Sequence, residues 1–206
     1  MFSIGEVFLI TRPDYEATTH VLFVGTKKIL KKSRELGVKT VSLDKNKANL
    51  VNFNKAMEDK RVGLINFNGH GQANLIVGQD DQLLVEVGFN EKILAGKIIY
   101  CLACQAGKKL GPAAVQAGTK AFMGYDEDFI FLEQMADWFL PPSNCLVEAL
   151  LTGKSSGEAY ELSQQAFQQN IQALLTSEAK RSYAVPYLVW DKKHQVCLGD
   201  KQARFR

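Results

Sequence analysis

The chain has 206 residues, of which 46% are hydrophobic and 23% are charged, and its formal net charge is +3. This length predicts one domain, residues 1–206, that can bury a substantial core without covalent staples. The basic residues are dispersed, and the densest run, at residues 27–34, falls on a predicted helix where it is expected to form a solvated face. A nucleic-acid partner is therefore not expected, because such proteins gather basic and aromatic residues on one surface.

The N-terminal stretch predicts a location in the cytoplasm. Residues 1–10 contain neither a basic segment nor a long apolar run, so we expect no signal peptide, no membrane span and no membrane partner. The chain has four cysteines without a secretory signal. That combination is typical of free thiols in a reducing compartment.

The first third of the chain alternates between strand and helix patterns. An apolar run at residues 6–11 is a strand closed by Arg-Pro-Asp, and a helix is expected at residues 20–36, capped by Thr18 or Thr19 and ended by Gly37. A strand at residues 39–43 and a helix at residues 47–59 follow, and the next apolar run, at residues 62–67, is the third strand.

The rest of the chain continues this alternation. A small hairpin is expected within residues 74–89, then a short helix at 90–95, a strand beginning at Ile98, a helix at 111–117 and a strand at 121–125. Helices at 143–151 and 155–175 follow, the second with a capping box formed by Ser155 and Glu158, and residues 187–190 and 195–198 suggest a final strand pair. Alternating strands and helices predict a doubly wound, mostly parallel sheet.

Two buried strands in this pattern each lead into a residue that can do chemistry. His70 follows the third strand in an Asn-Gly-His-Gly loop, and Cys104 follows the strand that begins at Ile98. Consecutive strands are usually neighbours, and parallel strands place their ends at the edge where α/β folds bind ligands. An imidazole can generate the nucleophilic thiolate of a nearby cysteine. We therefore expect a histidine–cysteine dyad, and the alternative is a structural histidine beside a cysteine that fills the core.

Other chemistries fit the pattern less well. Cys101 and Cys104 form a C-x-x-C pair, but residues three apart on a strand point to opposite faces, so Cys101 is expected in the core. Cys145 and Cys197 are isolated, so no metal site is expected. The glycine loop around His70 lacks the established phosphate-binding motifs, and no cofactor is expected.

The residues from about 62 to 199 resemble the caspase-like (clan CD) cysteine peptidases, most closely the CHAT type related to separase and the gingipains. The resemblance rests on an apolar run ending in His-Gly (64–71), an apolar run ending in Ala-Cys-Gln-Ala-Gly (98–107), and the segments 111–124, 150–159 and 186–199. It implies a three-layer α/β sandwich with a mostly parallel central sheet flanked by helices.

Carried over to this sequence, the resemblance implies roles for individual residues. His70 would be the general acid and base, Cys104 the nucleophile, and the backbone N–H groups of Gly71 and Cys104 the oxyanion hole. Relatives often bind a basic side chain before the cut with a carboxylate, for which the candidates are Asp14, Asp126 and Asp128. Some relatives carry an acidic residue two positions before the cysteine, where this chain has Leu102.

These inferences predict a cysteine endopeptidase that cleaves a protein substrate through an acyl-enzyme, with a preference for a basic residue implied by the family. The alternative is a catalytically silent caspase-like module that works by binding a regulatory partner protein. A cysteine hydrolase that acts on a non-peptide amide or a thioester is a third reading.

Overall fold

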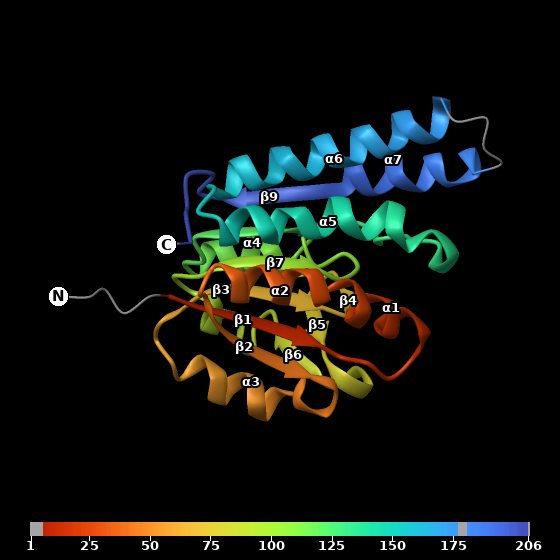
Figure 1. Ribbon diagram of the computed structural model, residues 1–206. Helices are drawn as coiled ribbons and strands as arrows, with labels where there is room; N and C mark the ends of the chain where they lie inside the picture. Colours follow the sequence, from red (N-terminus) through yellow and green to blue (C-terminus); the bar gives the residue numbers. More distant parts are fainter. Residues whose placement is uncertain (1–5, 177–180, 206) are drawn as a thin grey trace.

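A six-stranded sheet runs through the centre of the computed structural model, which describes residues 6–176 and 181–205 (Figure 1). In spatial order its strands are β2 (Lys39–Asp44), β1 (Val7–Arg12), β3 (Val62–Asn68), β7 (Ile98–Leu102), β8 (Ala121–Tyr125) and β9 (Gln195–Gly199). The first five are parallel, and β9 pairs antiparallel with β8. The predicted mostly parallel sheet is therefore confirmed.

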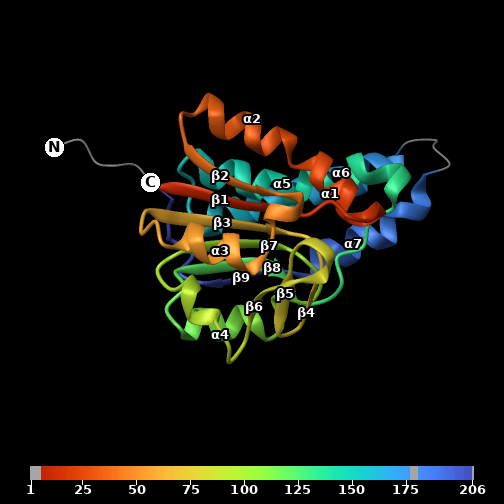
Figure 2. The same ribbon diagram turned by 90° about the horizontal axis from the view of Figure 1, so that it is seen from below.

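Helices cover both faces of the sheet, which gives three layers (Figures 1 and 2). The helices are α1 (Ala17–Gly25), α2 (Lys27–Glu35), α3 (Leu50–Met57), α4 (Leu110–Gln116), α5 (Ala136–Leu151), α6 (Ser156–Thr176) and α7 (Val185–His194). Successive residues of β1 point to opposite faces of the sheet. Phe8 and Ile10 belong to the core cluster formed with α1, α2 and α5, whereas Val7 and Leu9 belong to the cluster formed with α3. Such full burial explains why the central strands read as continuous apolar runs.

Three further features complete the architecture. A small antiparallel sheet of β4 (Gly71–Gln72), β5 (Leu75–Val77) and β6 (Leu83–Glu86) lies between β3 and β7 in the chain. The pairing of β5 with β6 is the hairpin predicted within residues 74–89. Short 3-10 helices are η1 (Lys45–Lys47), η2 (Gln79–Asp81), η3 (Glu91–Leu94), η4 (Glu133–Met135) and η5 (Ser182–Ala184). A third apolar cluster joins Phe139 of α5, Phe167 of α6 and Leu188 of α7, so α7 lies beside α6 (Figure 1).

The prediction of a strand at residues 187–190 is wrong, because this segment belongs to α7. Tyr187, Val189 and Trp190 favour strands locally. The buried positions Ala184, Leu188 and Asp191 are spaced four and three residues apart, however, which is the spacing of one helix face. Burial of this helix face therefore outweighs the local preference of residues 187–190 for a strand.

Two predicted helices also differ in their bounds. The helix expected at 20–36 is divided at Thr26, whose hydroxyl accepts a hydrogen bond from Arg12 and donates one to Phe23, and its cap is Glu16 rather than Thr18 or Thr19. The helix expected from residue 143 begins at Ala136 and contains two prolines. The capping box of α6 is confirmed, since Ser155 and Glu158 bond each other's backbone N–H.

Within the described part of the chain, every helix is too short or too polar to cross a membrane. Residues 1–5, half of the stretch considered for a signal peptide, lie outside the described residues.

Candidate active site

The strands that lead to His70 and Cys104 are direct neighbours in the sheet. β3 and β7 pair in parallel, and the last pair in their register is Asn68 with Leu102. His70 and Cys104 each follow two residues beyond that pair, and the Gly69 N–H donates to the Leu102 carbonyl at 3.3 Å. The expected adjacency of the two loops at the carboxyl edge is confirmed.

His70 and Cys104 both line one small cavity of about 70 Å³. Apart from His70 and Cys104, it is lined by Thr18, Leu22, Gly69, Leu102, Ala103, Phe129 and Phe131. Gly71 lies directly against the cysteine loop, since a β-carbon placed on it would be 3.1 Å from the Cys104 carbonyl oxygen. A larger residue at this position would require the cysteine loop to shift.

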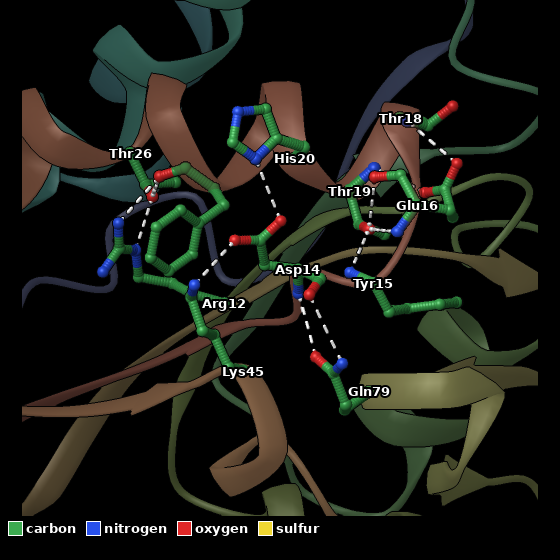
Figure 3. A network of polar contacts seen from close by, with 11 residues as sticks. Arg12, Asp14, Tyr15, Glu16, Thr18, Thr19, His20, Thr26, Lys45 and Gln79 are labelled. Atoms are coloured by element: carbon green, nitrogen blue, oxygen red, sulfur yellow. Dashed lines mark hydrogen bonds and ion pairs between the residues drawn. The ribbon is translucent and has the colours of Figure 1, made fainter.

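Glu16 is the immediate partner of His70, and sequence reasoning missed it. Its carboxylate lies 3.3 Å from His70 Nε2, and both side chains are more than one third exposed. The Glu16 carboxylate accepts hydrogen bonds from the N–H groups of Thr19 and Thr18 (Figure 3). Burial opposes ionisation of Glu16, but these bonds and the charge of His70 hold its pKa below the usual value. The same carboxylate thus caps α1 and orients the imidazole.

Cys104 is mostly enclosed. Burial raises the pKa of its thiol, and the negative charge of Asp128 adds to this effect. Its Sγ lies 4.0 Å from the main-chain oxygen of Phe129. Among the described residues, no main-chain carbonyl accepts the Cys104 N–H, which leaves it free to serve as an oxyanion donor.

The residues after β8, which we call the 126–132 loop, cover the cysteine. Gln105, in the left-handed conformation at φ 57°, donates its N–H to Glu127 at 3.1 Å and its side-chain amide to Asp128 at 2.9 Å. Lys108 forms an ion pair with Glu127 at 2.7 Å. The turn that begins at Cys104 and the 126–132 loop are therefore joined by several polar contacts.

Helix α7 holds the same loop from its other side. Trp190 Nε1 donates to the Asp128 carbonyl at 2.9 Å, and the Asp191 carboxyl accepts from the Ile130 N–H at 2.9 Å. His194 Nδ1 lies 2.9 Å from the Asp126 carboxylate. Asp191 is fully buried, its second oxygen has no partner within the described residues, and burial raises its pKa to about 8. Sequence reasoning missed this role of α7, because the local pattern predicts a strand here.

The three acids suggested for substrate binding are engaged elsewhere. Asp14 lies 3.0 Å from His20 Nδ1 and 3.3 Å from Lys45 Nζ, and its side chain is 12% exposed (Figure 3). Asp126 pairs with His194, and Asp128 accepts from Gln105. None of the three lines the cavity that holds Cys104.

The other cysteines lie apart from this cavity. Cys101 is fully buried in β7, as expected, and burial raises its pKa. Cys145 is in α5 and Cys197 in β9, and all four cysteines are free thiols. The described residues contain no group of three or more histidine, cysteine or acidic side chains placed to hold a metal ion.

Comparison with known proteins relates the fold to proteases at very low sequence identity. No protein-family model matches the sequence, and no curated protein matches it significantly. Gingipain R, described as an Arg-specific cysteine proteinase, is similar in structure, with a TM-score of 0.65 and 14% identity over 98% of this chain and 48% of that one.

Two further solved structures are also similar. The complex of the RgpB pro- and mature domains from Porphyromonas gingivalis has a TM-score of 0.65 and 12% identity, over 98% of this chain and 48% of that one. A third, described as a protease, has a TM-score of 0.59 and 12% identity, over 97% and 48%. This chain thus spans about half the length of each, and identities this low establish shared architecture alone. The chain has the caspase-like α/β fold of gingipain R.

Proposed function

We propose that this chain is a cysteine endopeptidase, a single caspase-like domain in which Cys104 is the nucleophile and His70 the general acid and base. The observation that carries the proposal is the shared cavity: both side chains follow adjacent parallel strands at equal distance from their last paired residues. Placement beside one cavity at matching strand ends is expected of a catalytic pair, and it is not required of a structural histidine or of a cysteine that fills the core. The assignment to the CHAT type rests on the sequence motifs.

The reaction follows from the protonation state of the resting site. The raised pKa of Cys104 keeps its thiol protonated at neutral pH. His70 accepts that proton as the sulfur attacks the peptide carbonyl, and it then donates the proton to the departing amine. A water molecule, deprotonated by His70, releases the acyl group and the thiol is restored.

The neighbours of the dyad have supporting roles. The N–H groups of Gly71 and Cys104 stabilise the negative oxygen of the tetrahedral intermediate. Glu16 keeps the imidazole in place, because its carboxylate is 3.3 Å from Nε2.

The test compares the parent with Cys104→Ala and His70→Ala variants on a mixture of unlabelled peptides, with cleavage products identified by mass spectrometry. We expect both variants to lose at least about a hundredfold in rate. Cys145→Ala is the matched control, because Cys145 is also a partly buried free thiol and lies in α5, away from the cavity. If Cys104→Ala cleaves as fast as the parent, the proposal is wrong.

One observation favours a second function. The enclosure of Cys104, with Sγ against the Phe129 carbonyl, also suits a catalytically silent module that binds a partner protein. Alkylation by a peptide-based electrophile separates the two readings. A peptidase is modified at Cys104 at least about tenfold faster than at Cys145 or Cys197, whereas a silent module shows equally slow modification at all of them.

A further inference from the structure

The cavity shared by His70 and Cys104 has apolar walls. Leu22 and Leu102 are at most 4% exposed, and Phe129 and Phe131 contribute from the 126–132 loop. Apart from the dyad, Thr18 supplies the polar side chain of the lining, and no carboxylate or cationic side chain other than the imidazole belongs to it.

Two of the three candidate acids already face basic side chains, and the third, Asp128, accepts a hydrogen bond from a neutral amide. Lys45 and His20 pair with Asp14, His194 pairs with Asp126, and the Gln105 amide engages Asp128. A guanidinium or ammonium group placed in the cavity would lose its water and find no carboxylate among the residues that line it. The Glu16 carboxylate, 3.3 Å from His70 Nε2, lies outside that lining.

We propose that this cavity binds the side chain on the acyl side of the cleaved bond, and that it selects a small apolar side chain of about valine size. The inference rests on the proposed peptidase function and specifies its substrate class. It replaces the preference for a basic residue that the family resemblance implied.

The size of the cavity limits the choice further. An apolar cavity of about 150 Å³ holds a benzene ring, which has six carbons. A volume of about 70 Å³ is roughly half of that and fits the three carbons of valine or the one of alanine. Leucine, arginine and lysine need the walls to move apart.

A separate hollow of about 440 Å³ is also lined by His70 and includes the exposed carboxylate of Asp81, which accepts a hydrogen bond from the Tyr15 hydroxyl. A basic residue elsewhere in a substrate can be bound there. The test must therefore vary only the residue next to the cleaved bond.

The experiment uses peptidyl acyloxymethyl ketones that are identical except for that residue, which is valine, alanine, leucine, arginine, lysine or aspartate. The sulfur of Cys104 displaces the carboxylate leaving group, and the rate of adduct formation at Cys104 is measured by mass spectrometry of the digested protein. We expect the valine and alanine probes to react at least about tenfold faster than the arginine, lysine and aspartate probes.

Two outcomes would overturn this inference, and they are distinguishable. Fastest modification of Cys104 by the arginine or lysine probe, or equal rates with all probes, overturns the selectivity while leaving the peptidase intact. Failure of every probe to modify Cys104 faster than Cys145 overturns the proposed function, and the selectivity with it.

Substitutions at the cavity wall should change the preference in predictable directions. Thr18→Asp places a carboxylate in the first turn of α1, where negative charge is favourable, and should raise the rate with the arginine probe at least about tenfold relative to the neutral Thr18→Asn control. Phe131→Ala enlarges the cavity and should move the optimum from valine to leucine. No change in either variant would show that the probes bind elsewhere.

Discussion

Replacing the buried Asp191 by asparagine should make the protein more stable at neutral and alkaline pH. In the parent, burial raises the pKa of Asp191 from 3.8 to about 8. The unfolded chain therefore releases this proton near pH 4, whereas the folded protein keeps it until about pH 8. Between these two pKa values only the unfolded chain is ionised at Asp191, and this favours unfolding. The contribution of Asp191 to the free energy of unfolding is therefore fully present below pH 4 and is lost as the pH rises toward 8.

The magnitude follows from the width of that window. Each pH unit between the two pKa values is worth about 1.4 kcal/mol, so the parent should lose about 4 kcal/mol between about pH 5 and about pH 8 through this group. The asparagine side chain cannot ionise, and its oxygen can still accept the hydrogen bond from the Ile130 N–H. Asp191→Asn should therefore gain roughly 4 kcal/mol over the parent across the same window.

The assay is urea unfolding followed by circular dichroism, in reducing buffer, at several pH values from about 5 to 9. Other ionisable groups contribute equally to both proteins, so the difference between the two curves isolates Asp191. Asp137→Asn, an exposed position on α5, is the control and should give a curve parallel to that of the parent. A constant difference between Asp191→Asn and the parent at every pH would refute the reasoning.

Three further substitutions test the site itself. Gly71→Ala should lower the rate of modification at Cys104 by roughly tenfold, because the added methyl group would lie 3.0 Å from Ala103 Cβ and 3.1 Å from the Cys104 carbonyl oxygen, and the cysteine loop would have to shift to make room. Glu16→Gln should lower kcat by roughly tenfold with little change in KM, since the imidazole loses a negative partner at 3.3 Å. Trp190→Phe removes the 2.9 Å bond to the Asp128 carbonyl and should speed local opening of the 126–132 loop about fivefold, as measured by amide hydrogen exchange at Ile130.

Each of these has an outcome that contradicts it. Gly71→Ala with parental kinetics would show that the loops do not touch in solution. A Glu16→Gln variant whose KM rises while kcat is unchanged would make Glu16 a substrate-binding residue. Unaltered exchange at Ile130 in Trp190→Phe would mean that the other contacts of the loop hold it without Trp190.

The central sheet and the adjacency of the His70 and Cys104 loops were predictable because their signals are local and strong. The fully buried strands β3 and β7 are mostly apolar, with Asn66 and Asn68 as the exceptions in β3, and His70 and Cys104 each lie two residues beyond the end of their strand. Cys101 is buried as predicted, but β7 ends at Leu102 and all of its residues are buried, so its place in an apolar strand accounts for this and strand parity does not. Short-range pattern was therefore enough to identify the two residues of the proposed dyad.

The surroundings of the dyad were not predictable, because they depend on residues distant in the chain. Glu16 reads as an ordinary loop acid, and its contact with His70 exists only once β1 and β3 are paired. The contacts of Trp190 and Asp191 with the 126–132 loop span about 60 residues of sequence. The local preference of residues 187–190 for a strand made these contacts harder still to predict. The segment forms a helix because one of its faces is buried, and that burial is not visible in the local sequence.

The position of α7 and β9 in the chain has a consequence for synthesis. Proteins emerge from the ribosome N-terminus first. His70, Cys104 and the 126–132 loop are therefore all made before Trp190, Asp191 and the strand that pairs with β8. During translation the 126–132 loop lacks its contacts with α7 until about 60 further residues have been added. A nascent chain therefore carries His70 and Cys104 beneath a loop that α7 does not yet hold in place.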